Sequence, residues 1–142
     1  MIAVDTDVLV IHHLFVWDKR REVNEKFLST VRTLSTTVHN LLELCGITAK
    51  VTSEDKAIDI LRSYLASNHW TIIFPRLPNS WEEYVDKIIK YLVKGMSFGD
   101  SLIAWTIDEC EEVEAFITWN IRGFKGKIKV PVYTPREYLT LH

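Results

Sequence analysis

The chain has 142 residues, 47% of them hydrophobic and 25% charged, and a formal net charge of −2 at pH 7. These values are typical of a globular domain that is long enough to bury a core. They exclude a protein that coats nucleic acid through bulk positive charge. No apolar stretch approaches the roughly 20 residues that a membrane helix requires. We expect one domain over residues 1–142, no membrane association, and a cytoplasmic location, because the N-terminal residues lack the basic segment of a signal peptide.

The chain begins with a short apolar strand that ends on two acids. Residues 2–5 form this expected strand, and Asp5 and Asp7 lie in the sequence VDTDVLV. Ionised carboxylates side by side repel each other, so they are kept most readily where a cation offsets their charge or where a helix begins. Two interpretations stay open: a cation site, or a helix N-cap at Thr6 or Asp7.

The next segments alternate between helical and extended patterns. Apolar residues at three- and four-residue spacing predict helices over residues 19–34, from Val38 to Gly46, and from Thr52 or Ser53 onward. Short apolar or β-branched runs predict the strands, which cover residues 35–37 (a strand or a helix cap), 70–74, 115–118 and 130–133.

The helix after Pro78 has the clearest pattern in the chain. Ser80 and Glu83 have the spacing of a capping box, and a further helix begins at Ser97. Apolar residues of the first helix repeat with helical period until Gly95, at Trp81, Tyr84, Val85, Ile88 and Leu92. Strands separated by helices predict an α/β fold, a three-layer α/β/α sandwich with a mostly parallel central sheet.

Polar residues follow several of these strands. Glu43 lies in the helix after the second strand, Asp100 in the first turn of the helix at SFGDSLIAW, and Asn120 after the strand AFIT. The carboxyl ends of parallel strands meet at one edge, so we expect these residues to join Asp5 and Asp7 there. Carboxylates without histidine or cysteine suit Mg²⁺ or Mn²⁺, which can generate hydroxide and neutralise a phosphate. The set therefore points to phosphodiester hydrolysis.

Each of the later polar residues also has a simpler structural explanation. Asp100 stands three residues after Ser97 and can complete a capping box. Glu43 falls outside the apolar stripe of its helix, which favours a solvent-facing position. Asn120 is an amide that cannot act as a base, and it can simply turn the chain before Gly123.

Four segments in this order resemble the sequence blocks of PIN domains, most closely those of the VapC-type toxin ribonucleases: VDTDVLV, STTVHNLLELCGI, SFGDSLIAWTIDE and FITWNIRGF. The resemblance covers essentially the whole chain and implies a Mg²⁺- or Mn²⁺-dependent endoribonuclease. Asp5, Glu43 and Asp100 match the family's acidic positions, whereas Asn120 stands where many members have a fourth acid. Asp7 matches a position that is usually Ser or Asn, so we rank it below the other three metal ligands. An antitoxin partner and a homodimer are also implied.

Two basic runs are candidates for RNA binding. We interpret the first, residues 19–21, as solvated surface. The second leaves the turn at Asn120 beside the acids, so we expect Arg122, Lys125 and Lys127 to contact RNA phosphates.

Two other functions stay open. The segments DTDVL and GDSLIA resemble motifs of haloacid dehalogenase-like phosphatases, in which Asp5 would be the nucleophile. That class requires other residues at Leu9 and Ala104. The second alternative is a PIN-like module that binds RNA or a protein with little or no catalysis, which Asn120 motivates.

Overall fold

The computed structural model describes residues 1–142. Its centre is one sheet of five strands, all parallel, in the order β3-β2-β1-β4-β5. The strands are β1 (Ile2–Val4), β2 (Leu34–Thr37), β3 (Trp70–Ile73), β4 (Ala115–Ile117) and β5 (Val132–Tyr133). The chain adds β2 and β3 on one side of β1 and then returns to place β4 on the other. The carboxyl ends of β1 and β4 therefore form the topological switch point, where open α/β sheets bind ligands.

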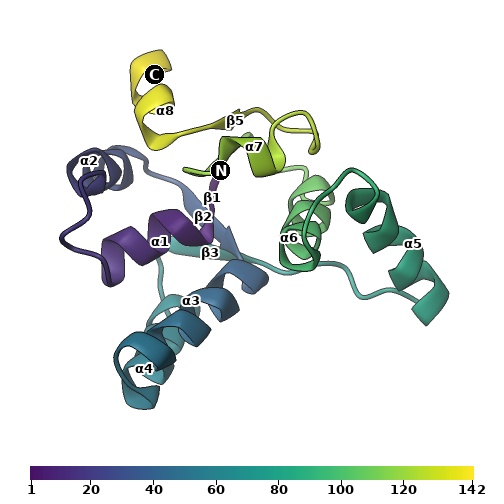
Figure 1. The fold of residues 1–142 in the computed structure, drawn as a ribbon, viewed down its shortest axis with the longest axis horizontal. Helices are drawn as coiled ribbons and strands as arrows, with labels where there is room; N and C mark the ends of the chain where they lie inside the picture. The colour runs from purple at the N-terminus through teal and green to yellow at the C-terminus, as the bar shows by residue number, and fades with distance from the viewer.

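Eight helices cover the two faces of this sheet (Figure 1). One face carries α1 (Thr6–His13), α2 (Arg21–Thr30), α3 (Val38–Val51), α4 (Glu54–Leu65) and α8 (Pro135–Leu141). The other carries α5 (Trp81–Leu92), α6 (Phe98–Asp108) and α7 (Ile121–Phe124). This arrangement confirms the expected three-layer sandwich, and the sheet is parallel throughout.

Alternation along the strands explains the two separate cores. In β1, Ile2 and Val4 face the core under α1 to α4, whereas Ala3 faces the core under α5 and α6. In β4, Ile117 faces the core under α1 to α4 and Phe116 faces the core under α5 and α6. Successive side chains of a strand point to opposite faces, so a strand covered by helices on both sides is apolar at every position.

The second strand is polar in sequence yet fully buried. The hydroxyl groups of Ser35 and Thr36 donate to the carbonyl oxygens of Ile2 (3.0 Å) and Val4 (2.9 Å) in the adjacent strand. Thr37 ends the strand and is also the N-cap of α3. The segment is thus both a strand and a helix cap, the two roles that the sequence left open.

One expectation about a helix end is wrong, and one predicted helix is only partly covered by its neighbours. Gly46 does not end its helix, because α3 continues to Val51 and a glycine inside a helix costs only about 1 kcal/mol relative to alanine. On α5 the apolar residues are divided between two sides: Ile88 is buried, whereas Trp81 and Val85 are 81% and 56% exposed. The helix is therefore amphipathic against α6 and also carries a second, uncovered apolar stripe.

The C-terminal helix α8 and the short helix α7 were not predicted. α8 begins with a complete capping box, since the Thr134 hydroxyl accepts from the Glu137 N–H and the Glu137 carboxylate accepts from the Thr134 N–H. The predicted box at Ser80 is only half formed, because the Glu83 carboxylate accepts from the Asn79 N–H instead. None of the helices has both the length and the apolar character needed to cross a membrane.

Candidate active site

Asp5 links the end of β1 to the start of α1. Its backbone N–H extends the sheet by donating to the Ile117 carbonyl (2.9 Å), and its carboxylate accepts from the Thr6 N–H (2.8 Å) as the N-cap of α1. The cap is therefore Asp5 and not Thr6 or Asp7, because Asp5 is the last residue with extended backbone. The carboxylate is 7% exposed at this position.

Asp7 lies beside Asp5 and shares a hydrogen-bond donor with it. The Thr118 hydroxyl, just after β4, lies 2.7 Å from Asp5 Oδ2 and 3.2 Å from Asp7 Oδ2. The Trp119 N–H also donates to Asp7 Oδ2 (3.0 Å). The other oxygen, Asp7 Oδ1, is buried and has no hydrogen-bond partner. A buried carboxylate oxygen without a partner is costly, and it is the kind of atom that a cation or an ordered water satisfies.

Asn40 organises the other side of the cluster, and the sequence analysis missed it. This fully buried amide donates to Asp5 Oδ1 (2.9 Å) and to the Thr6 hydroxyl (2.9 Å), and it accepts from the Thr37 hydroxyl (2.7 Å). The Thr6 hydroxyl in turn donates to Glu43 Oε1 (3.1 Å). The signal in the sequence was the spacing, because Asn40 stands three residues after the N-cap Thr37 and therefore faces the end of the strands.

Glu43 and Asp100 complete a group of four carboxylates. Glu43 is exposed, as its position outside the apolar stripe of its helix predicts, and the Thr6 hydroxyl holds it beside the other acids. Asp100 lies in the first turn of α6, where its N–H donates to the Ser97 hydroxyl (3.1 Å). The Asp100 carboxylate does not accept a hydrogen bond from the Ser97 N–H, so Asp100 does not complete a capping box.

Burial raises the proton affinity of all four carboxylates, and neighbouring negative charges add to the rise at Asp5 and Glu43. Burial raises the pKa of Asp5 well above its usual value, and the charge of Asp7 raises it further. Burial also raises the pKa of Asp7, of Glu43 and of Asp100, and the charge of Asp100 adds to the rise at Glu43. None of the four forms an ion pair. The site therefore concentrates negative charge that the protein itself does not neutralise.

Asn120 is placed next to this cluster without joining it. Its backbone N–H donates to the Thr118 hydroxyl (2.9 Å), but its side chain is exposed and makes no hydrogen bond to the four carboxylates. The amide lies against Gly123 instead, where an added Cβ would come within 2.6 Å of Asn120 Nδ2. A larger residue at position 123 would therefore displace the Asn120 side chain.

The residues fit a hard divalent cation in donor type. All of them supply oxygen, and Asp7 supplies an oxygen without a partner. No three acidic, histidine or cysteine side chains converge on one point as a ready metal centre would. An ion at this edge would take one or two carboxylates and keep several waters, which is the usual habit of Mg²⁺.

Comparison with solved structures defines the fold. VapBC2 from Rickettsia felis matches with a TM-score of 0.63 and 20% identity over 93% of this chain and 97% of that chain. VapC20 from Mycobacterium tuberculosis, a sarcin-ricin loop cleaving toxin, matches with a TM-score of 0.63 and 14% identity over 89% and 91%. A toxin–antitoxin complex from Klebsiella pneumoniae matches with a TM-score of 0.62 and 17% identity over 95% of this chain and 98% of that chain. The chain has the fold of VapC-type PIN domains. No protein-family model and no curated protein matches its sequence.

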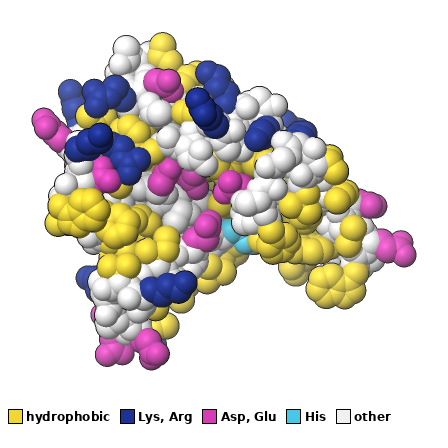
Figure 2. All heavy atoms as spheres, in the orientation of Figure 1, with side chains coloured by type: hydrophobic (Ala, Val, Ile, Leu, Met, Phe, Trp, Pro, Cys, Tyr) yellow, Lys and Arg dark blue, Asp and Glu magenta, His cyan; other side chains and the backbone are white.

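Basic side chains flank the acids of this PIN-like fold. Figure 2 shows Asp and Glu side chains near the middle of one face, with Lys and Arg side chains on both sides above them. Of the three expected RNA contacts, Lys127 lies close enough to Asp100 to lower the pKa of that carboxyl. Arg122 and Lys125 are exposed and form no ion pair. The first basic run is not simply solvated, because the guanidinium of Arg20 stacks on Trp119.

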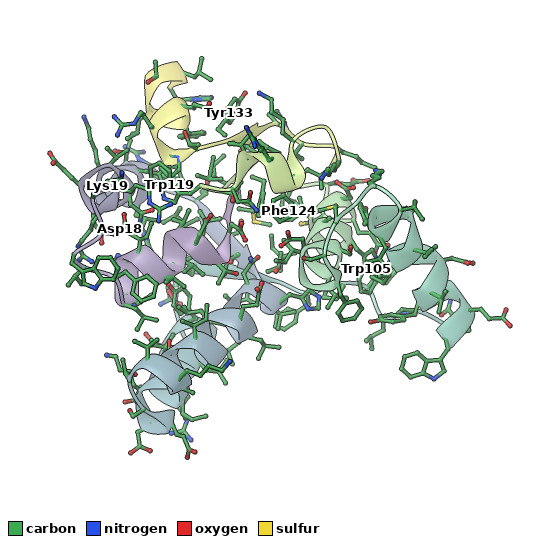
Figure 3. The ribbon with its side chains drawn as sticks, in the orientation of Figure 1. Asp18, Lys19, Trp105, Trp119, Phe124 and Tyr133 are labelled. Carbon is green, nitrogen blue, oxygen red and sulfur yellow. The ribbon has the colours of Figure 1, made fainter.

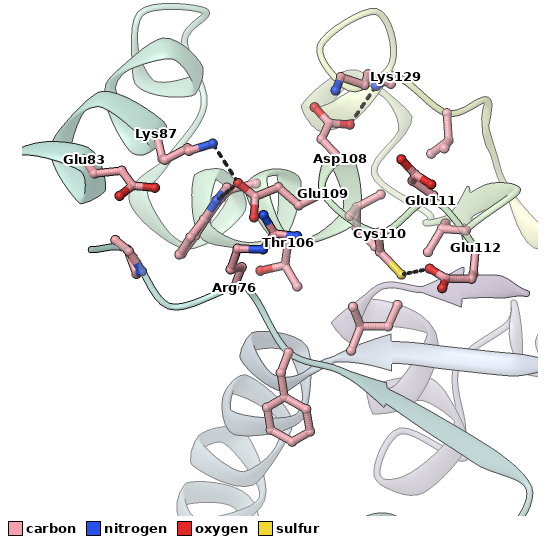
Figure 4. Close-up of a pocket in the computed structure, with 17 residues that line it drawn as sticks. Arg76, Glu83, Lys87, Thr106, Asp108, Glu109, Cys110, Glu111, Glu112 and Lys129 are labelled. Atoms are coloured by element: carbon pink, nitrogen blue, oxygen red, sulfur yellow. Dashed lines mark hydrogen bonds and ion pairs between the residues drawn. The ribbon is translucent and has the colours of Figure 1, made fainter. Parts of the chain in front are cut away.

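A cavity of about 770 Å³ lies apart from the acids (Figure 4). It opens between the exit of β3, α5 and the loop that leads from α6 into the amino end of β4. Its lining includes the ion pair of Lys87 with Glu109 (3.0 Å) and the Cys110 thiol, which donates to Glu112 (3.3 Å). None of the four clustered carboxylates lines it. We place the candidate active site at the acidic edge, because its carboxylates form no ion pair and Asp7 Oδ1 has no partner, whereas Glu109 in the cavity is already paired with Lys87.

The repulsion within the cluster predicts an unusual effect of Asp7→Asn. A raised folded pKa means that the folded state binds the proton more tightly, so the stability of the native chain increases as the pH falls from neutral through that pKa. The variant keeps the acceptor for Trp119 and removes the charge. We expect metal-free Asp7→Asn to melt at a higher temperature than the unmodified chain at pH 7, with a difference that shrinks toward pH 4. Thermal unfolding at several pH values measures it, with the exposed Asp59→Asn as the control. Equal melting at pH 7 would contradict the repulsion.

The network around Asn40 predicts a large loss of stability for Asn40→Ala. The variant leaves the O–H of Thr37 without an acceptor and one acceptor position on Asp5 without a donor, and such groups cost about 1–3 kcal/mol each when buried. Urea unfolding measures the change in the free energy of unfolding. Thr48→Ala is the matched control, since that buried hydroxyl bonds only to its own helix, at the Leu44 carbonyl. If Asn40→Ala lowers the free energy of unfolding no more than Thr48→Ala does, the hydrogen bonds of Asn40 do not stabilise the fold as predicted.

Proposed function

We propose that the chain is a Mg²⁺- or Mn²⁺-dependent endoribonuclease whose site is the cluster of Asp5, Asp7, Glu43 and Asp100. One observation carries the proposal: four carboxylates from three separate segments lie near one another at the switch point without forming an ion pair, and one buried oxygen of Asp7 is unpaired. Structural likeness to toxins, one of which cleaves the sarcin-ricin loop, supports RNA as the substrate.

The residues take distinct roles in this proposal. Asp5 and Asp7 hold the divalent ion, and Asn40 and Thr118 fix the Asp5 carboxylate for that task. The ion, when bound, lowers the pKa of a water and offsets phosphate charge. Glu43 and Asp100 face the same edge, where they bind the ion or its water ligands. Asn120 can orient a water or donate to a phosphate oxygen, but as an amide it cannot accept a proton.

The shape of the edge favours single-stranded RNA or an RNA loop. The acids lie at the ends of strands between α1, α3 and α6, where an accessible backbone can reach them and a regular duplex presents its phosphates less directly. Basic side chains beside the acids then bind flanking phosphates.

The structure weakens the phosphatase alternative. Both oxygens of Asp5 accept hydrogen bonds, from the Thr6 N–H, from Asn40 and from Thr118, and the carboxylate caps a helix. Only Oδ2 keeps a free lone pair, and in our proposal the divalent ion uses it, so Asp5 serves as a ligand and not as a nucleophile.

Metal-dependent cleavage is the direct test of the proposal. We expect the chain to cut a mixed pool of single-stranded RNA in Mn²⁺ or Mg²⁺ and to stop when a chelator is added. Asp100→Asn should reduce the rate by about 100-fold or more, because even indirect metal contacts contribute 10–100-fold. Its melting temperature should change little, since only a helix-dipole interaction of about 0.3–1 kcal/mol is lost. Gel analysis of cleavage measures the rate, with Asp59→Asn as the control.

The outcomes separate the nuclease from a binding module. RNA binding without chelator-sensitive cleavage would favour the module, and a large gain of cleavage in Asn120→Asp would show that the natural amide limits the site. A clear loss of stability in Asp100→Asn with cleavage intact would remove Asp100 from the site.

We also propose two protein partners. Several structural neighbours are toxin–antitoxin complexes, which supports an antitoxin that covers the acidic edge. A homodimer is supported by the uncovered stripe on α5, in which Trp81, Val85, Ile89 and Val93 are each 46–81% exposed at four-residue spacing. A contiguous exposed apolar stripe of this kind marks an interaction surface, and two copies can bury it about a two-fold axis.

Charge placed on the stripe should disrupt the dimer. We expect the native chain to have the mass of two chains in light scattering after size exclusion, and Val85→Asp to have the mass of one. Leu141→Asp is the control, because Leu141 is 62% exposed on a different helix. A native monomer, or a Val85→Asp dimer, would contradict the proposed interface.

A further inference from the structure

Arg20 is held in one position by a carboxylate on its own loop. Its Nε–H and one Nη2–H donate to the two oxygens of Asp18, at 3.0 and 2.9 Å, and its backbone N–H donates to Asp18 Oδ1 (2.8 Å). This two-bond pairing fixes the plane of the guanidinium. The Asp18 side chain is only 13% exposed, whereas that of Arg20 is 41% exposed. The guanidinium is thus ordered and accessible at the same time.

The second contact of Arg20 connects it to the candidate active site. Its guanidinium carbon lies 5.5 Å from the centre of the Trp119 ring. Trp119 is itself fixed at both ends, since its indole N–H donates to Asn24 (2.9 Å) and its backbone N–H donates to Asp7 (3.0 Å). Figure 3 shows Asp18, Lys19 and Trp119 close together where α2 meets the end of β4. Trp119 therefore connects Arg20 to Asp7, one of the four clustered carboxylates.

The remaining donors of Arg20 point to a ligand. A guanidinium has five N–H groups, and only two of them are used within the protein. Asp18 offsets the charge of Arg20, so attraction for an anion comes from these free donors and from the exposed Lys19, which has no ion pair. Oriented N–H donors beside a cation are suited to phosphate oxygens.

We propose that Arg20, held by Asp18 and Trp119, binds a backbone phosphate of the RNA strand at the Asp7 end of the carboxylate cluster. Lys127 lies near Asp100, at the other end of the cluster. The strand then runs from Arg20 past the four acids toward Lys127. This inference rests on the proposed ribonuclease function, and it assigns substrate binding to a basic run that the sequence indicated as plain surface.

A purely structural role for Arg20 makes different predictions. If the contacts with Asp18 and Trp119 only stabilise the loop between α1 and α2, Arg20→Ala lowers the melting temperature and leaves substrate affinity alone. If Arg20 binds a phosphate, its removal raises KM more than it lowers kcat, and it also makes binding less sensitive to salt.

The test compares Arg20→Ala, Arg20→Lys and Lys26→Ala in the full chain. Lys26 is the matched control because it is an exposed cation on α2 that forms no ion pair. Binding of a fluorescein-labelled single-stranded RNA is followed by anisotropy at several salt concentrations, in an Asp100→Asn background so that the probe stays intact. Cleavage with Mn²⁺ in the unmodified background supplies KM and kcat.

We expect Arg20→Ala to weaken RNA binding about tenfold and to reduce the slope of log K against log salt by about 0.7, the value for one contact to a single strand. Arg20→Lys keeps the charge without the two-bond pairing, so its affinity for RNA should fall between that of the parent chain and that of Arg20→Ala. Lys26→Ala should match the parent in both affinity and slope. If Arg20→Ala does not fold, Arg20→Lys decides, because an affinity equal to that of Lys26→Ala would then overturn the proposal.

The failure of this inference is distinguishable from that of the ribonuclease proposal. If the native chain cleaves RNA and Arg20→Ala matches Lys26→Ala in KM and salt slope, Arg20 is structural and the ribonuclease proposal stands. If the native chain neither binds nor cleaves RNA, both proposals are overturned.

Discussion

The Asp5 carboxylate is the interaction on which the rest of the site depends. It caps α1, and it accepts hydrogen bonds from Asn40 on α3 and from Thr118 after β4. These partners come from both sides of β1, so one side chain ties together the two halves of the sheet at the switch point. Its position also brings Asp7 beside it, since Asp7 lies in the first turn of the helix that Asp5 caps.

This arrangement opposes folding locally while the cores favour it. Four carboxylates with raised pKa values lie near one another and have no ion pair, which destabilises the folded state at neutral pH. Apolar side chains on both faces of the sheet offset this repulsion, because β1 and β4 contribute to one core or the other at every position. Local strain held by a stable scaffold is common where function requires a group in an unfavourable setting.

The surface around the site combines opposite kinds of recognition. Arg20 lies near Asp7 and Lys127 lies near Asp100, while the apolar stripe of α5 lies on a separate part of the molecule (Figure 1). Electrostatic contacts suit a polyanion that binds and dissociates, whereas an exposed apolar stripe suits a stable protein–protein interface. The proposed RNA contacts and the proposed dimer interface thus lie on separate surfaces.

The sequence by itself determined the sandwich and its parallel sheet and indicated the four acids as candidates, because short apolar strands, helical periods and acidic residues near strand ends or in the following helices are local patterns. Only the tertiary structure decided which partners those acids have. Asn40 and Thr118 contact Asp5 across 35 and 113 positions of the chain, and Arg20 contacts Trp119 across 99 positions. No local sequence pattern indicates contacts between residues so far apart. The exposed side of α5 was hidden for the same reason. A helical period shows that residues share a face, but only the packing of neighbouring elements determines whether that face is covered.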